Sequence, residues 1–315
     1  MSQMNGTHMA NSAPTRDSTT LRPAITDMKL PLTPQEISAE WLTDALEFRY
    51  PGAQVNSAVI VDVINGTSTK IRVRLQYNRA GMDAGLPPTL IVKGGFESHS
   101  PSMKAMYLNE TRFYRDVKPF IDIHTPRCYY AGSDPGSHQS IVILEDLKAK
   151  NVTFCDPLRP QSYEQVATRL EVMARYHAQT WNSADFKPGG RFDWVLGRHE
   201  GWSLEYCARY LVPSVWQHYM ESPRGAAVPK ILHDRDWMEN ALKNLGTYHR
   251  HCPQCLVHGD THLGNLYVEA DGTPGFFDAQ TSKGPWQLEV AYHMVAALDI
   301  ADRKHYEKPL LTGSP

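Results

Sequence analysis

Residues 256–266 read LVHGDTHLGNL, and residues 275–278 read GFFD. Short apolar segments flank both stretches, which predicts strands whose ends bring Asp260, Asn265 and Asp278 to one cleft. Phosphoryl transfer needs such a set, because one carboxylate orients the attacking hydroxyl while an Asn oxygen and a second carboxylate hold Mg²⁺. We therefore predict that Asp260 is the catalytic residue and that Asn265 and Asp278 are metal ligands.

The pattern His258-Gly259-Asp260-X-His262-X-X-Asn265 resembles the catalytic loop of the aminoglycoside phosphotransferase and choline kinase superfamily. Asp260 and Asn265 are also five positions apart, as in the kinase loop. Residues 277–280 (FDAQ) resemble the metal-binding segment that follows, although Ala279 stands where protein kinases have Phe. The layout over residues 32–305 most resembles the ecdysteroid-kinase-like branch.

This resemblance implies an enzyme that transfers phosphate from ATP, with Mg²⁺, to a hydroxyl of a small molecule. It also implies the α+β, protein-kinase-like fold with two lobes. The N-terminal lobe is expected to be an antiparallel sheet with one helix, and the C-terminal lobe to be mainly helical. We expect a disordered arm at residues 1–30, a nucleotide-binding lobe with its hinge at 31–148, and a catalytic and acceptor lobe at 149–315.

Upstream residues fit the same resemblance. Lys93 ends the apolar segment at residues 90–92 and resembles the lysine that binds the α- and β-phosphates. Glu110 lies in a helical segment and resembles the glutamate that pairs with this lysine. Taken alone, each could be a solvated surface charge, but their order before the catalytic loop favours a functional pair.

Two further segments are expected to contact the nucleotide. Gly66, Thr67 and Ser68 occupy the place of the loop that covers the phosphates, where small residues let backbone N–H groups approach phosphate oxygens. A glycine in a tight strand turn is equally expected on structural grounds. Glu145 and Leu147 resemble the hinge, whose backbone contacts adenine.

Local patterns predict the elements around these residues. Thr33 as N-cap, Pro34 at the first position and Glu36 as the partner in a capping box predict a helix start. Strands are predicted at residues 57–64, 70–77, 89–93 and 140–144, and a helix at residues 102–117. From residue 163 onward the patterns are mostly helical.

Composition narrows the class of protein. The 32 basic and 34 acidic residues give a formal charge of −2, which argues against a nucleic-acid partner. No uncharged apolar run is long enough to span a membrane, and no secretory segment stands at the start, so a cytoplasmic protein is expected. Five cysteines are too few and odd in number for a disulfide framework. Oligomeric state cannot be predicted.

The acceptor is expected to be apolar. Residues 181–220 hold nine aromatic side chains, and this region forms part of the acceptor pocket in the resembled family, although core packing explains many such rings. Six acidic and seven basic residues lie at 181–235, whereas a polycationic aminoglycoside would need an acidic pocket. A sterol-like alcohol fits better than an antibiotic or choline.

Two alternatives remain. Relatives normally continue with several more helices beyond the point where this chain ends, which favours a pseudokinase that binds nucleotide and acts as an interaction module. The Cys252-X-X-Cys255 pair, near His249, His251 and His258, could supply zinc ligands, but no second ligand pair has a familiar spacing. We favour the active enzyme without a zinc site.

Overall fold

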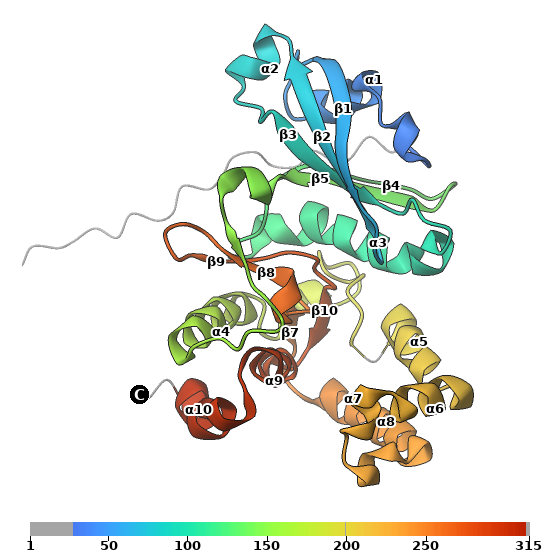
Figure 1. Cartoon of the computed structure of the whole chain (residues 1–315), viewed down its shortest axis with the longest axis vertical. Coiled ribbons are helices and arrows are strands. Elements are labelled where there is room, and N and C mark those ends of the chain that lie inside the picture. Colours follow the sequence, from blue (N-terminus) through green and yellow to red (C-terminus); the bar gives the residue numbers. More distant parts are fainter. Residues whose placement is uncertain (1–27, 199, 313–315) are drawn as a thin grey trace, which may run out of the picture.

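The computed structural model describes residues 28–198 and 200–312. A five-stranded antiparallel sheet forms the part towards the N-terminus, and helices dominate the part towards the C-terminus, which confirms the predicted fold class (Figure 1). Most of the expected N-terminal arm lies outside the described residues. Leu30, at the predicted end of the arm, is only 2% exposed and packs in the core. The boundary near residue 148 stays a prediction.

The large sheet has the strand order β1-β2-β3-β5-β4. Its strands are β1 (Val55–Ile64), β2 (Thr69–Tyr77), β3 (Thr89–Gly94), β4 (Cys128–Asp134) and β5 (Gln139–Glu145). The sequence patterns predict four of them to within two residues at either end. They miss β4, whose first five residues are all buried and therefore do not alternate between apolar and polar.

Alternation along β2 separates the two faces of this sheet. Ile71 and Val73 are fully buried and join the core around α1 (Ala39–Glu47). Lys70 and Arg72 point to the opposite face, because side chains on a strand alternate between faces. On the neighbouring strand β3, Lys93 lies directly opposite Lys70. This second face of the sheet therefore carries Lys70, Arg72 and Lys93, of which Lys93 is a predicted site residue.

The first helix begins later than predicted. Thr33 makes no side-chain capping bond, and Pro34–Glu36 form only a single 3₁₀ turn. Ser38 is the true N-cap of α1, since its side chain accepts a hydrogen bond from the backbone of Trp41. The helix buries one apolar face, made up of Trp41, Leu42, Ala45 and Leu46.

Helix α3 (Lys104–Arg112) lies between the sheet and the C-terminal elements (Figure 1). It continues as a π-helical segment, Phe113–Val117, so the predicted helix over residues 102–117 is regular only in its middle. Phe113 and Tyr114 join a core that extends to β7 and β9. The Asn109 side chain donates a 2.8 Å hydrogen bond to the carbonyl of Thr281, which ties α3 to the C-terminal part.

Short strands hold the predicted catalytic segments. Strand β7 (Cys255–Val257) pairs with β10 (Ser282–Gly284), and β8 (Leu266–Val268) pairs with β6 (Thr153–Phe154) and β9 (Pro274–Phe276). Asp260 follows β7, and Asp278 follows β9. The helices are α4 (Tyr163–Gln179), α5 (Gly201–Tyr210), α6 (Pro213–Glu221), α7 (Pro223–Ala226), α8 (Arg235–His251), α9 (Trp286–Ala297) and α10 (Ile300–Thr312), and the short α2 (Arg79–Asp83) follows β2.

In the part of the chain that the structure describes, no helix has the length and apolar character needed to cross a membrane.

Candidate active site

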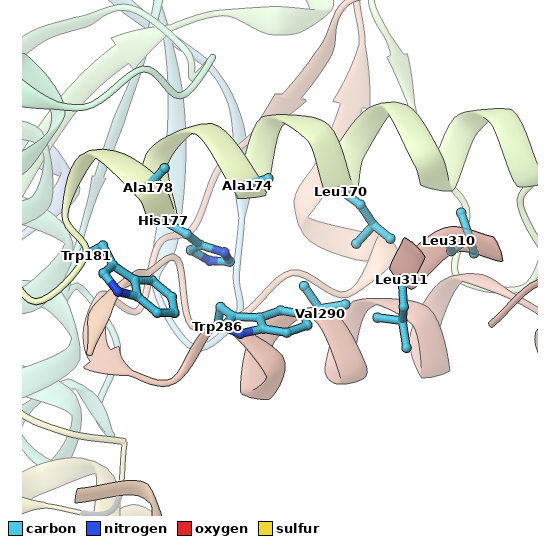
Figure 2. Close-up of a pocket in the computed structure, with 9 residues that line it drawn as sticks. All are labelled: Leu170, Ala174, His177, Ala178, Trp181, Trp286, Val290, Leu310 and Leu311. Atoms are coloured by element: carbon cyan, nitrogen blue, oxygen red, sulfur yellow. The ribbon is translucent and has the colours of Figure 1, made fainter. Parts of the chain in front are cut away.

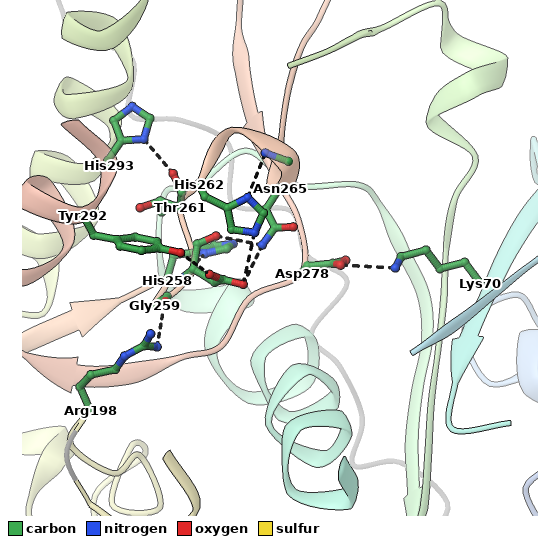
Figure 3. Close-up of polar contacts among 12 residues, drawn as sticks. Lys70, Arg198, His258, Gly259, Thr261, His262, Asn265, Asp278, Tyr292 and His293 are labelled. Carbon is green, nitrogen blue, oxygen red and sulfur yellow. Dashed lines mark hydrogen bonds and ion pairs between the residues drawn. The ribbon is translucent and has the colours of Figure 1, made fainter. Parts of the chain in front are cut away.

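The loop between β7 and β8 fixes both oxygens of the Asp260 carboxylate. The side-chain Nδ2 of Asn265 donates to Oδ2 of Asp260 at 2.9 Å and to its backbone carbonyl at 3.0 Å. The Tyr292 hydroxyl, from α9, donates to Oδ1 at 3.0 Å (Figure 3). Since each oxygen has its own donor, the carboxylate is held in one orientation and faces the cavity.

The phenol of Tyr292 stays protonated and can act as this donor. Burial and the nearby charge of Asp260 raise the pKa of Tyr292 to about 12. His262 contributes a weaker contact, with its Nε2 atom 3.7 Å from Oδ2 of Asp260. Tyr292 was not predicted as a site residue, because nothing in the local pattern of α9 marks a residue that contacts a loop 32 positions earlier.

A buried lysine, Lys93, joins the large sheet to the predicted metal-binding segment that contains Asp278. Lys93 Nζ lies 2.6 Å from Glu110 and 2.6 Å from Oδ1 of Asp278, and its side chain is 4% exposed. Burial alone would lower the pKa of Lys93, but the charges of Asp278 and Glu110 raise it above its ordinary value. Burial alone would raise the pKa of Asp278, but Lys93 and Lys70 hold it below its ordinary range. Lys93 and Asp278 are therefore both charged at neutral pH.

Gly259 lies where the predicted catalytic loop contacts the predicted metal-binding segment. Its φ angle is +86°, which lies in the left-handed region, and a Cβ atom here would come within 2.1 Å of the carbonyl oxygen of Gln280. Only glycine satisfies both constraints. Arg198 donates to the Gly259 carbonyl at 2.6 Å, so the loop is also held from the acceptor side.

A buried carboxylate supports the same loop from below. Glu289 of α9 accepts hydrogen bonds from the Gly259 backbone at 2.9 Å, the Tyr176 hydroxyl at 2.5 Å and His177 Nε2 at 2.8 Å. Burial alone would raise the pKa of Glu289, but the hydrogen bond and charge of His177 hold it below its usual value. Glu289 therefore anchors the loop to α4 and α9.

A buried histidine holds the residue after Asp260. The His293 Nδ1 atom donates to the carbonyl of Thr261 at 2.8 Å, and the imidazole is fully buried (Figure 3). Burial lowers the pKa of His293 to about 4. The side chain is therefore neutral at physiological pH, which suits a hydrogen bond inside the core.

Two cavities meet at Lys70, Lys93 and Asp278. The first, of about 380 Å³, we call the acceptor cavity; its lining includes Asp260, Asn265, Glu110, Thr67 and Ser68. The second, of about 270 Å³, we call the base cavity; its lining includes Glu145, Leu147, Ile91, Leu144, Phe154 and Phe277. Nine of the ten predicted site residues thus line one or both cavities. Gly66 is the exception, since it lines neither of them.

The loop between β1 and β2, which is predicted to cover the phosphates, is tied to the segment around α3. The carbonyl of Thr67 accepts hydrogen bonds from the Tyr107 hydroxyl and from His99. These contacts hold the loop beside the acceptor cavity, whose lining includes Thr67 and Ser68 but not Gly66.

The residues present fit Mg²⁺. Both side-chain hydrogen bonds of Asn265 use Nδ2, which leaves its Oδ1 atom to bind a metal. Asp278 supplies a charged carboxylate at the same cavity, and Mg²⁺ prefers oxygen ligands, with phosphate oxygens and water completing its shell. Among the described residues, no group of three or more His, Cys, Asp or Glu side chains could hold a metal ion.

A third cavity, of about 550 Å³, lies apart from these residues between α4, α9 and α10 (Figure 2). Its lining is mainly apolar and includes Trp181, Trp286 and Leu311, with His177 as the polar exception. It contains no carboxylate among the described residues that line it, so we do not place the chemistry there. Trp181, one of the nine aromatic residues of the predicted acceptor region, belongs to this cavity.

Only two of those nine aromatic residues, Trp202 and Tyr206, are among the lining of the acceptor cavity. Others pack in the core, as Phe192 does, or against charged groups, as Trp194 does beneath Arg112. The predicted aromatic pocket is therefore smaller than the sequence suggested. Met106, Tyr107 and Tyr292 contribute to its wall instead.

Part of the chain is similar to a known protein family, and several solved structures resemble the chain. Residues 65–189 match the ecdysteroid kinase-like family, and no curated protein matches the chain. Similar solved structures include a GDP complex of wild-type aminoglycoside 2'-phosphotransferase-IIIa (12% identity, 87% of this chain and 85% of that chain covered, TM-score 0.47). Another is a macrolide 2'-phosphotransferase from Brachybacterium faecium (13% identity, 86% of this chain and 82% of that chain covered, TM-score 0.48). A third is a Plasmodium vivax ethanolamine kinase (11% identity, 82% of this chain and 68% of that chain covered, TM-score 0.48). The match over residues 65–189 confirms the resemblance of this chain to the ecdysteroid kinase-like family.

Proposed function

We propose that this protein is an ATP- and Mg²⁺-dependent phosphotransferase that acts on a hydroxyl of a small, largely apolar molecule. The observation that carries the proposal is that Asp260, Asn265, Asp278 and Lys93 line one cavity, which meets an apolar cavity beside residues 144–147. Each of these side chains has a role in phosphoryl transfer that its contacts support.

The base cavity suits the adenine ring of ATP. Its wall is largely apolar, with Ile91, Leu144 and Leu147 on one side and the edge-to-face pair of Phe154 and Phe277, whose ring centroids are 6.1 Å apart. Sites for small ligands are typically concave and mostly apolar, with a few polar groups that fix the ligand's orientation. Lys93, at the junction with the acceptor cavity, would then meet the α- and β-phosphates.

Asp260 is the group that would accept the proton. The hydroxyl oxygen of the acceptor forms a bond to the γ-phosphorus while the bond from that phosphorus to the β–γ bridging oxygen breaks. The hydroxyl proton passes to the Asp260 carboxylate, and ADP leaves. Mg²⁺, held by Asn265 and Asp278, would neutralise charge on the phosphate oxygens.

Charge in the acceptor cavity argues against a polycationic acceptor. Among the described residues of its lining, three carboxylates face three cations and His262. Two of the carboxylates, Glu110 and Asp278, are already paired with lysine. Trp202, Tyr206 and Tyr292 supply apolar surface instead. The matched family is named for ecdysteroid kinases, which also supports an alcohol on an apolar ring system.

A phosphate-transfer assay tests this function. The purified protein, with Mg²⁺ and labelled ATP, would be screened against sterols, aromatic alcohols, choline and kanamycin-type compounds, with Asp260→Asn as the inactive control. We expect label in a bulky alcohol and none with the variant. Label in the aminoglycosides alone would overturn the apolar acceptor, and nucleotide binding without any transfer would favour a pseudokinase.

A further inference from the structure

A second lysine lies at the point where the two cavities meet. Lys70 lines both of them, as do Lys93 and Asp278. Its Nζ atom lies 3.5 Å from Oδ2 of Asp278 (Figure 3). Lys93 contacts Oδ1 of the same carboxylate. The sequence analysis did not select Lys70, because in β2 it reads as one of several polar residues that alternate with buried ones.

The arrangement of these charges is unusual for a sheet. Lys70 and Lys93 are direct partners in the register of β2 and β3, so their side chains leave the same face side by side. Like charges at such positions destabilise a sheet. Here Asp278 lies between the two ammonium groups and offsets their repulsion. A ligand that draws Asp278 towards a metal ion leaves Lys70 without its partner and in need of another anion.

The two lysines differ in how free they are to meet a ligand. Lys93 is 4% exposed and fixed between two carboxylates, whereas the Lys70 side chain is 30% exposed and has the single, longer contact to Asp278. Lys70 also follows Thr67 and Ser68, which line the acceptor cavity but not the base cavity. Lys70 therefore lies where the base cavity adjoins the acceptor cavity, which also contains Asp260.

We propose that Lys70 binds the terminal phosphate of ATP, as a cation separate from Lys93. The proposal rests on the proposed function, in that it requires ATP in the base cavity. In the free protein Lys70 pairs with Asp278; in the complex the terminal phosphate takes the place of that carboxylate. The transferred group would then meet positive charge from strand β2 on the side opposite the catalytic loop.

Calorimetric titration of Mg²⁺ complexes of ADP and of a non-hydrolysable ATP analogue tests this directly. Lys70→Met removes the charge and keeps much of the side-chain length, and Lys70→Arg keeps the charge. Arg74→Met is the matched control, because Arg74 is an exposed cation on the same face of β2 and lines neither cavity. Thermal melting would establish that each variant is folded.

We expect Lys70→Met to weaken binding of the triphosphate analogue by about tenfold, the scale of one charge-assisted hydrogen bond, and to change ADP affinity less than about twofold. Lys70→Arg and Arg74→Met should stay within about threefold of the wild type for both nucleotides. An equal loss for ADP and the analogue, or no loss for either, would overturn the proposal. Wild-type protein that binds neither nucleotide would instead overturn the proposed function, and this proposal with it.

Discussion

The Nζ atom of Lys93 and the Oδ1 atom of Asp278 lie 2.6 Å apart, although 185 positions separate the two residues in the chain. This contact joins strand β3 of the large sheet to the segment after β9. Glu110 completes it from α3. The groups that would hold the phosphates and the metal therefore come from three separate parts of the chain.

Loss of Lys93 should destabilise the fold as well as the site. Lys93→Met leaves Glu110, which is 4% exposed, without a cation, and breaking a buried pair in this way costs about 3 kcal/mol. The double variant Lys93→Met/Glu110→Gln should recover part of that loss, because no uncompensated charge remains on Glu110. Urea unfolding of the two single variants and the double variant measures this coupling. Additive losses would contradict it.

Asp278→Asn should weaken the binding of ATP in the presence of Mg²⁺ and have little effect in its absence. Asn is the variant of choice because Asp278 has a φ angle of +58°, a region that Asn tolerates well and Ala does not. Calorimetric titration with Mg²⁺ and with EDTA separates the two cases. Unchanged affinity in Mg²⁺ would show that Asp278 does not bind the metal.

Glu289→Gln should loosen the catalytic loop from beneath. The amide has only one acceptor oxygen, so either Gly259, which contacts Oε1, or Tyr176 and His177, which share Oε2, lose their acceptor, at a cost of about 2 kcal/mol or more. We expect a lower melting temperature and a lower kcat, with KM for ATP nearly unchanged. Glu171→Gln, an exposed change on α4, is the control and should alter neither quantity.

Stability should fall as the pH drops from about 6.5 to about 4. Burial lowers the pKa of His293 to about 4, so within this window the unfolded chain binds a proton that the folded chain does not. The stability that the neutral histidine contributes is complete at a pH above the pKa of His293 in the unfolded chain. Below that pH it is lost at about 1.4 kcal/mol for each unit by which the pH falls. Burial also lowers the pKa of His258, which adds to the effect. Urea unfolding between pH 4 and 8 should show a shallower slope for His293→Gln, and an identical slope would refute this origin.

Tyr292→Phe should reduce kcat by about tenfold, because Oδ1 of Asp260 loses the donor that orients it. KM for ATP should change little, since Tyr292 lies at the acceptor cavity and not at the base cavity. Tyr206→Phe is the matched control: Tyr206 also lines the acceptor cavity, but its hydroxyl lies 3.0 Å from that of Tyr210, whereas the hydrogen bond to Oδ1 of Asp260 comes from Tyr292. Equal effects of the two variants on kcat would mean that the contact to Asp260 has no special role.

The sequence predicted best those parts of the site that depend on local spacing. Asp260 and Asn265 lie on one short loop, so their five-position interval places them together whatever the rest of the chain does. Lys93 and Glu110 could be selected because each ends or occupies a recognisable element. The contact that joins this pair to Asp278 depends on the three-dimensional fold, and the sequence predicted that fold only through the family resemblance.

The residues that the sequence did not reveal act across long separations. Glu289, Tyr292 and Arg198 contact the catalytic loop from elements 30, 32 and 61 positions away. None of them belongs to a local pattern that differs from an ordinary helix or loop. The prediction of where α1 begins failed for another reason. Thr33 and Ser38 are both good N-cap residues, and only tertiary packing decides between them.

The contact at Gly259 has a consequence for tolerance to insertion. Backbone hydrogen bonds from Gln280 to His258 and from Phe277 to Asn265 align the two functional segments directly, without help from the turn at residues 270–273 that connects their strands. That turn is exposed and only closes the hairpin. A longer turn there would leave the distance between Asp260 and Asp278 unchanged, because loop length adds only a small entropic cost. A peptide tag or a reporter domain could therefore be inserted in the turn at residues 270–273, whereas position 259 could not accept even a methyl group.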